Sequence, residues 1–388
     1  MVKKRWSQVL RIVSGKSQKA VLNPNGQYPI YGSGGIMGYA DDFLCEAGTT
    51  IVGRKGTINN PIFVSERFWN VDTAFGICPG DELIPKYLYH FCCFYNFKSL
   101  DKSTTIPSLA KSDLLNIEMP VPPIPEQERI VARIEELFSQ LDSGVETLQK
   151  IKQQLAVYRQ AVLKEAFEGR LTAYWRHIHN FQSQWKTVSI SYLIQTNKCA
   201  LKAGPFGSSL KKDCYVPSGY KVYGQEQVIS GNEEYGDYYI SKQKYQELIS
   251  CKVAPNDILI SLVGTIGKVL ILSEKCKAGI INPRLIKVSL DPDKMIPEFF
   301  KYYFESGYLR SLYKTRAHGA TMDVLNMRMI KELPFAWCPV EEQHSVVDEI
   351  ESRLSACDSI EKTVDTALQQ AEAMRQSILK QAFEGEQI

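Results

Sequence analysis

The hydrophobic pattern of this chain is dominated by one long segment that occurs twice. Residues 126–169 and 342–385 align without a gap, and about nineteen of their forty-four positions are identical. In both copies apolar residues recur at steps of three and four, which predicts a long amphipathic helix of the coiled-coil type. The apolar stripe of the first copy comprises Ile134, Phe138, Leu141, Val145, Leu148, Ile151, Leu155, Tyr158 and Val162. The stripe of the second copy comprises Ile350, Leu354, Cys357, Ile360, Val364, Ala367, Ala371, Met374 and Ile378.

Proline precedes each copy and glycine ends it, at Gly169 and Gly385, as is typical of helix starts and ends. At 1.5 Å per residue, roughly 40 residues form a rod of about 60 Å. Gly144 lies inside the first copy, where it costs about 1 kcal/mol relative to alanine and favours a bend. Two such stripes in one chain predict that the helices pack on each other as an antiparallel coiled coil. Two independent surface helices are the alternative.

The rest of the chain forms two blocks with one common order of elements. Each block begins with short strand-like runs that alternate with turns. It continues with an apolar helix, which starts at Pro85 in the first block and at Pro297 in the second, and ends with a polar loop and a last strand. We therefore expect an α+β fold, with two related mixed α/β domains separated by the two long helices and a pseudo-two-fold arrangement. The expected boundaries are domain 1 at 1–125, helix 1 at 126–170, a linker at 171–184, domain 2 at 185–338 and helix 2 at 339–388.

The two helices resemble each other much more closely than the two blocks do. Similar helices indicate one geometric task performed twice, whereas diverged blocks indicate two different targets. A chain of this plan suits a partner that is itself dyad-symmetric, and duplex DNA is such a partner.

Several segments carry a resemblance to a known family. They are PFGSSLKKDCYVPSGYKVY (205–223), NDILISLVGTIGKV (256–269), NPRLIKV (282–288), MPVPPIPEQERIV (119–131) and the two AFEG helix endings. With these, nearly the whole chain resembles the specificity subunit of type I restriction-modification systems. The resemblance implies that each block is a target recognition domain reading one half of a bipartite, asymmetric DNA site. It also implies that the paired helices set the spacer between the halves.

The same resemblance implies the partners of the chain and its lack of catalytic residues. Two methyltransferase (modification) subunits would dock on the helices, and two restriction subunits would join them. S-adenosylmethionine would bind the methyltransferase, and ATP and Mg the restriction subunit, so we expect neither cofactor nor metal on this chain. For partner binding we predict positions that the two helix copies share: Glu126, Gln127, Arg159, Glu342, Gln343 and Arg375. The second copy departs from the proline-rich entry of the first, with Trp337-Cys338-Pro339-Val340, so its docking turn is expected to differ.

Other functions were weighed against this one. A specificity subunit of a combined restriction-methylation (type II-like) system stays open, and a coiled-coil protein without DNA contact fits the diverged, loop-rich blocks poorly. For a self-contained DNA methyltransferase or nuclease, the required motifs are missing. Asn282-Pro283 and Asn60-Pro61 lack the Asn/Asp-Pro-Pro-aromatic tetrad, and the segment 264–268 lacks the spacing of a phosphate-binding loop. His177 and His179 have no further ligand nearby in sequence for a metal.

The composition says little about the binding partner and more about the cellular compartment. A net charge of +3 neither requires nor excludes nucleic acid, because a local basic surface can occur in a balanced chain. The ten cysteines contain no CxxC pair, which favours reduced thiols and a cytoplasmic protein. We expect neither a secretory signal nor a membrane span, since no run approaches 18 uncharged apolar residues.

Contacts to phosphates and bases need cations, hydroxyls and amides on loops. We predict that the loop 314–321 is the strongest candidate, because it aligns with the loop 102–105 of the first block. The DNA-binding candidates are Arg54, Lys55, Lys98, Lys102, Ser103, Thr104 and Thr105 in domain 1, and Lys202, Ser208, Ser209, Lys211, Lys212, Lys268, Arg284, Lys314, Arg316, His318 and Thr321 in domain 2.

Overall fold

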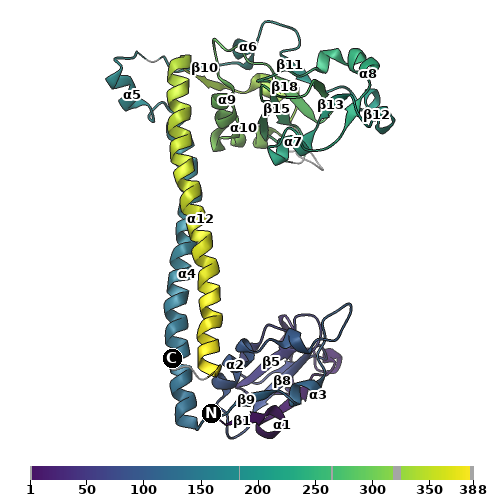
Figure 1. Cartoon of the computed structure of the whole chain (residues 1–388), viewed down its shortest axis with the longest axis vertical. Coiled ribbons are helices and arrows are strands. Elements are labelled where there is room, and N and C mark those ends of the chain that lie inside the picture. Colours follow the sequence, from purple (N-terminus) through teal and green to yellow (C-terminus); the bar gives the residue numbers. More distant parts are fainter. Residues whose placement is uncertain (1, 183, 264, 318–324, 385–388) are drawn as a thin grey trace. The chain divides into compact units, whose positions relative to one another are not determined.

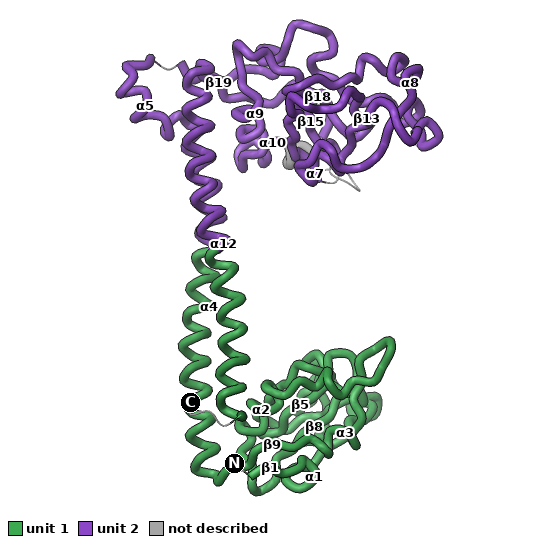
Figure 2. Tube along the Cα trace, in the orientation of Figure 1, with its two compact units in different colours: residues 1–151, 363–388 green, residues 152–362 purple. Residues whose placement is uncertain are grey.

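The computed structural model describes residues 2–182, 184–263, 265–317 and 325–384, with the side chains of 313–317 excepted. The chain divides into two compact units, shown in Figure 2: unit 1 comprises residues 1–151 and 363–388, and unit 2 comprises residues 152–362. The long helices α4 (Ile124–Phe167) and α12 (Val340–Glu384) each contribute residues to both units. The predicted α+β fold with two long helices is confirmed, and α4 continues through Gly144.

The main sheet of unit 1 has four antiparallel strands in the order β2-β8-β5-β6. Helix α2 (Pro85–Phe94) packs on it through a core that includes Val52, Phe75 and Phe91 (Figure 1). A second sheet has the order β4-β3-β7, with β3 parallel to β7, and β1 pairs with β9. The strands are β1 (Lys3–Arg5), β2 (Leu10–Ser14), β3 (Tyr28–Gly32), β4 (Gly35–Ala40), β5 (Thr49–Gly53), β6 (Ile62–Val64), β7 (Trp69–Asn70), β8 (Ala74–Pro79) and β9 (Glu118–Pro120). The short helices are α1 (Trp6–Val9), η1 (Gln18–Ala20), η2 (Phe97–Leu100) and α3 (Lys111–Leu115).

Unit 2 repeats this topology with a larger second sheet. Its main sheet has the antiparallel order β11-β18-β15-β16, covered by helix α9 (Pro297–Glu305). Its second sheet has the order β12-β14-β13-β17, again with one parallel pair, and β10 pairs with β19. The strands are β10 (Lys186–Val188), β11 (Leu201–Ala203), β12 (Tyr215–Val216), β13 (Tyr220–Tyr223), β14 (Tyr239–Ile240), β15 (Ile258–Ser261), β16 (Val269–Ile271), β17 (Gly279–Ile281), β18 (Leu285–Val288) and β19 (Phe335–Trp337). The remaining helices are α5 (Ala173–Ile178), α6 (Ile190–Leu193), η3 (Gly207–Ser209), η4 (Lys212–Cys214), α7 (Gln225–Ser230), α8 (Lys242–Glu247), η5 (Ile249–Cys251), α10 (Gly307–Ala317) and α11 (Met327–Glu332).

Within each unit the two long helices run antiparallel. In unit 1, Ile134 near the start of α4 shares a core with Phe383 at the end of α12. In unit 2, Val162 near the end of α4 shares a core with Ile350 near the start of α12. The predicted packing of the two stripes on each other is therefore present in both units.

The seam between the helices differs from the predicted stripe at one repeated position. Tyr158 and its repeat equivalent Met374 point outward, with 45% and 53% of their surface exposed, and Ile360 is also exposed. The next residue of each copy, Arg159 or Arg375, lies on the seam instead. Each arginine forms an ion pair with an aspartate of the opposite helix. The arginine side chain, with its apolar stem and charged end, therefore takes the place of a hydrophobic residue on the seam.

Two further features concern the predicted linker and the predicted lack of a membrane span. The expected linker contains α5, which begins just after Thr172. Among the described residues, no helix is long and apolar enough to span a membrane.

Candidate nucleic-acid interface

One end of the main sheet gathers the candidate loops in unit 1. Because the strands are antiparallel, the end of β2, the end of β5, the start of β8 and the start of β6 share one edge. A fourth segment joins them through hydrogen bonds from Leu109 N to Arg54 O and from Gly56 N to Pro107 O, both of 2.9 Å. The loops 15–20, 54–61, 71–73 and 101–109 therefore lie together, although they are far apart in sequence.

The predicted residues of domain 1 lie on this edge and are exposed. A groove of about 360 Å³ joins the 56–59 loop to Lys98, Asp101 and Pro107. Arg54 donates to the carbonyl of Asp72 at 3.2 Å, and Lys102 pairs with Asp113 at 3.0 Å. The exposed members of the predicted set are Arg54, Lys55, Lys98, Lys102, Ser103, Thr104 and Thr105.

A carboxylate at the centre of this surface holds the loop in shape. Asp101 accepts hydrogen bonds from the Ser103 hydroxyl at 2.6 Å and from the backbone N–H groups of Ser103 and Ser108 at 3.0 and 3.1 Å. These bonds lower the pKa of Asp101. The carboxylate therefore stays ionised, and its hydrogen bonds fix the shape of the 101–109 loop.

Unit 2 gathers its loops at the equivalent edge of its own sheet. The end of β11, the end of β15, the start of β18 and the start of β16 lie together. Hydrogen bonds from Gly204 N to Leu285 O (2.9 Å) and from Leu262 N to Arg284 O (3.0 Å) tie the loops to each other. Of the predicted residues here, Ser208, Lys211, Lys212, Lys268 and Arg284 are exposed, and Lys202 and Ser209 are partly buried.

The prediction for the segment 314–321 requires a correction. Lys314 and Arg316 belong to helix α10, which extends to Ala317, and not to a loop. His318 and Thr321 lie outside the described residues. The matching segment of unit 1, 102–105, is a loop, so the two units differ in structure at this place.

Sequence reasoning missed three residues on these edges. Lys16 and Lys19 are exposed on the 15–20 loop of unit 1, and Phe206 is exposed on the corresponding loop of unit 2. Lys16 and Lys19 follow a short strand closely, and this position in the sequence could have identified them as candidates for DNA binding. Phe206 lay within the quoted PFGSSL segment, but an apolar residue gives no sign that it faces water.

Three of the residues predicted to bind a partner are buried, and the two glutamines among them make the same contacts in the two units. Gln127 has no exposed surface, and its amide oxygen accepts from Ile84 N at 3.0 Å. Its amide nitrogen donates to Glu82 O at 2.7 Å and to Pro122 O at 2.8 Å. This side chain therefore joins the start of α4 to the start of α2, within unit 1.

The second glutamine repeats this arrangement in unit 2. Gln343 is also fully buried, accepts from Ile296 N at 3.0 Å, and donates to Lys294 O at 2.8 Å and Cys338 O at 2.7 Å. Residues with no exposed surface cannot contact a partner in this structure. The repeated glutamine thus forms an internal joint, which corrects the prediction for Gln127 and Gln343.

The other four predicted positions divide by their contacts. Glu342 is buried and accepts hydrogen bonds from the Thr172 hydroxyl at 2.8 Å and from Trp185 Nε1 at 2.9 Å, so it too is internal. Its repeat equivalent Glu126 is partly exposed. Arg159 pairs with Asp358 at 2.7 Å and Glu361 at 2.8 Å, while Arg375 pairs with Asp142 and lies 5.0 Å from the ring centroid of Phe138.

These two ion pairs are the same pair under the repeat. A shift of 216 positions converts Asp142 into Asp358 and Arg159 into Arg375. Each arginine therefore crosses the seam to the aspartate of the other copy, which explains why both residues are identical in the two helices.

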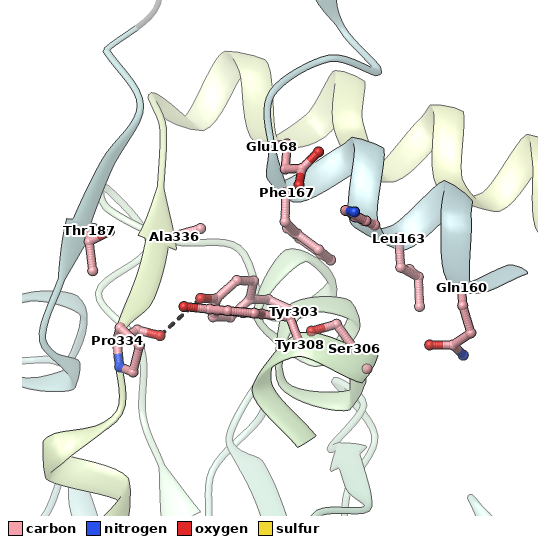
Figure 3. Close-up of a pocket in the computed structure, with 12 residues that line it drawn as sticks. Gln160, Leu163, Phe167, Glu168, Thr187, Tyr303, Ser306, Tyr308, Pro334 and Ala336 are labelled. Carbon is pink, nitrogen blue, oxygen red and sulfur yellow. Dashed lines mark hydrogen bonds between the residues drawn. The ribbon is translucent and has the colours of Figure 1, made fainter. Parts of the chain in front are cut away.

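Unit 2 has an apolar recess beside the end of α4. Figure 3 shows this cavity of about 490 Å³, in which Phe167 of α4 faces the ring of Tyr303, whose hydroxyl donates to Pro334 O. At the equivalent place in unit 1, Phe94 stacks on Phe383, with ring centroids 5.6 Å apart. Unit 2 has Ser306 at the position of Phe94, and the recess results from this smaller side chain.

The described residues contain no group of three or more His, Cys, Asp or Glu side chains arranged to hold a metal ion. His179 bonds the carbonyl of Trp175 at 2.8 Å through Nδ1, as part of the α5 segment. The chemistry available at the two sheet edges is thus that of cations, hydroxyls and backbone amides, which suits binding of an anionic polymer.

Comparison with known proteins agrees with this chemistry. A family model described as "Type I restriction modification DNA specificity domain" matches residues 1–156 and 184–370. The type I restriction enzyme EcoBI specificity subunit of Escherichia coli is 27% identical over 353 residues, which cover 87% of this chain and 73% of that protein. The StySPI specificity subunit of Salmonella potsdam is 29% identical over 326 residues, 79% of this chain and 66% of that protein.

The chain spans about two thirds to three quarters of the length of these two relatives. A chain in the structure described as "Structural basis underlying complex assembly and conformational transition of the type I R-M system" has the same fold, with a TM-score of 0.75 and 16% identity over 100% of this chain and 98% of that one. Because the family model covers both domains and most of both long helices, this chain belongs to the type I restriction-modification DNA specificity family.

Proposed function

We propose that the chain is the non-catalytic DNA sequence-recognition subunit of a type I restriction-modification complex. Domain 1 (1–125) and domain 2 (185–338) each read one half of a bipartite, asymmetric DNA site. One observation carries this proposal. Two sheets of equal topology present loops at the same edge, and the loops match in position but differ in sequence.

The loops supply the groups that duplex DNA requires. The exposed cations and hydroxyls contact phosphates and fix the register, and the side chains that differ between the units contact base edges. Neutralising six to ten phosphates makes affinity fall by about 10³ to 10⁵ between 50 and 200 mM salt. The whole predicted set of DNA-binding residues stays within this proposal, including Lys314 and Arg316 of α10 and also His318 and Thr321.

The paired helices dock two methyltransferase subunits. Exposed apolar side chains support this, because Tyr158 in unit 2 and Met374 in unit 1 occupy equivalent positions of the repeat. Two equivalent positions suit two copies of one partner. S-adenosylmethionine binds that partner, and ATP and Mg bind two further restriction subunits, in the cytoplasm where the DNA is.

The first experiment tests the division of labour between the domains. It measures binding of the assembled complex to duplexes in which one half-site or the other is scrambled. We expect Lys55→Ala to weaken binding wherever the domain 1 half is intact and Arg284→Ala to do so for the other half, each lowering the salt slope by about 1. Equal losses on both scrambled duplexes for both variants would contradict separate half-sites.

The second experiment tests docking. Tyr158→Glu and Met374→Glu place a charge on an exposed apolar contact without touching either core. We expect each variant to reduce the bound methyltransferase from two copies to one, and the double variant to none, by mass measurement of the complex. Gln149→Glu, on an exposed position of α4, is the matched control. Retention of two copies by the double variant would contradict docking at this position.

The third experiment tests the spacer. Removal of 145–151 from α4 together with 366–372 from α12 keeps the seam in register, because Asp142 still meets Arg375 and Arg159 still meets Asp358. Seven residues shorten a helix by about 10 Å, or roughly three base pairs. An unchanged spacer in the methylated site would exclude the helices as its determinant.

A further inference from the structure

The loop after β11 holds the most exposed large hydrophobic side chain found in the described part of the chain. Phe206 has 87% of its surface in water. Its neighbours Gly207, Ser208 and Ser209 are small, and Lys211 and Lys212 follow. Along the sequence, the exposed ring is therefore flanked by small, polar and cationic residues.

The backbone beneath Phe206 is firmly anchored. A Cβ added to Gly204 would lie 1.8 Å from Asn282 O, so this backbone touches the turn between β17 and β18 and excludes any side chain. Gly204 N donates to Leu285 O at 2.9 Å, Pro205 is buried, and Ser209 N donates to Phe206 O at 2.8 Å. The ring is thus presented by a rigid turn beside Arg284.

Unit 1 has the same turn without the ring. A Cβ on Gly15 would lie 1.8 Å from Val71 O, which reproduces the contact of Gly204. The turn η1 follows as η3 does, and Ser17 holds the capping position that Phe206 holds in unit 2. At this capping position, unit 1 therefore has a hydroxyl group and unit 2 has an exposed aromatic ring.

We infer that Phe206 inserts its ring against the base stack of the DNA bound by unit 2, and that Ser17, at the same position of unit 1, makes no such insertion. This inference rests on the proposed DNA binding. Apolar side chains inserted at a base step unstack it and kink the duplex, while surrounding cations hold the phosphates on either side. Lysines, arginine and serines around a single ring match that chemistry, whereas a protein-binding surface needs a wider apolar patch.

The test uses the complex with its methyltransferase subunits and a duplex that contains the mapped bipartite site. The base analogue 2-aminopurine, whose fluorescence rises when it is unstacked, replaces one base at a time in both half-sites, excluding the methylated base because that base is expected to be flipped. We expect the fluorescence to rise at a step of the half-site bound by unit 2. Phe206→Ala abolishes it and lowers affinity on the order of 10-fold, and Phe206→Trp retains it.

Ser17→Ala is the matched control and leaves the signal unchanged. The inference is overturned if no step is unstacked by the wild-type complex that binds the duplex, or if the signal survives Phe206→Ala. It is also overturned if Phe206→Ala releases the methyltransferase subunits while unstacking persists, which assigns the ring to a protein interface. A wild-type complex that does not distinguish the site from scrambled DNA contradicts the proposed function itself.

Discussion

The two buried glutamines offer the sharpest test of how the helices are joined to the domains. We predict that Gln127→Ala destabilises unit 1 and that Gln343→Ala destabilises unit 2 by a similar amount. Each side chain makes three hydrogen bonds to backbone groups and has no exposed surface. Its loss leaves one N–H and two carbonyl groups without their partner in a space that Ala cannot fill.

The magnitude follows from these three bonds. A net contribution of about 0.5–1.5 kcal/mol for each bond, and a penalty of about 1–3 kcal/mol for a buried donor left unpaired, give a loss of roughly 3–7 kcal/mol. For a unit of this size, that corresponds to a fall in Tm of roughly 10 °C.

A charged variant adds a pH signature to this prediction. In Gln343→Glu the carboxyl group faces two carbonyl oxygens, which favours its protonated form and raises its pKa above the ordinary value of about 4.3. The folded state then holds a proton that the unfolded state releases. The stability of this variant relative to wild type therefore falls as pH rises above about 4.3.

The assay is urea unfolding of the full chain, followed by circular dichroism and by tryptophan fluorescence. Gln149→Ala, at an exposed position of α4, is the control and is expected to change stability by less than about 0.5 kcal/mol. If Gln127→Ala and Gln343→Ala cost no more than this control, the account of the joint is wrong.

Three more predictions concern buried or paired charges. Burial lowers the pKa of His90 from 6.5 to about 4, so unit 1 loses roughly 3 kcal/mol as pH falls through this interval, and His90→Phe removes that pH dependence of unfolding. Arg375→Ala costs more than Asp142→Ala because it also removes the guanidinium over an aromatic ring, and a double-mutant cycle gives a coupling of about 0.2–1 kcal/mol that weakens with salt. Asp257→Ala leaves the buried Lys287 ammonium without its carboxylate, 3.5 Å away, and costs about 3–5 kcal/mol, most of which Lys287→Met restores in chemical denaturation.

The sequence was sufficient for the elements whose signal is local. A stripe sustained over forty residues has no competing interpretation, so both long helices were found close to their observed ends. Helix α4 begins at Ile124, two residues before the expected start, because Pro125 is tolerated in a first helical turn. The repeat also indicated two related domains, since each element of one block had a counterpart in the other.

What the sequence could not supply depends on long-range contacts. Both copies of the repeat have glutamine at the position of Gln127, which indicates a shared role. Its partners near residue 84 are more than forty positions away in the sequence, so the sequence does not distinguish an internal joint from a docking surface. Likewise, loops 54–61 and 101–109 meet through hydrogen bonds of Arg54 with Leu109 and of Gly56 with Pro107, which no local pattern encodes. Phe206 shows the same limit, since the backbone contact of Gly204 turns an apolar residue outward.

The central claim is that this chain chooses the DNA sequence on which a partner enzyme acts. The most direct test is a genome-wide map of modified bases in host cells with the gene intact, deleted and restored, with the methyltransferase subunit present throughout. The account predicts that methylation at one bipartite, asymmetric motif disappears on deletion and returns on restoration. Methylation of that same motif in cells that lack the chain would contradict it.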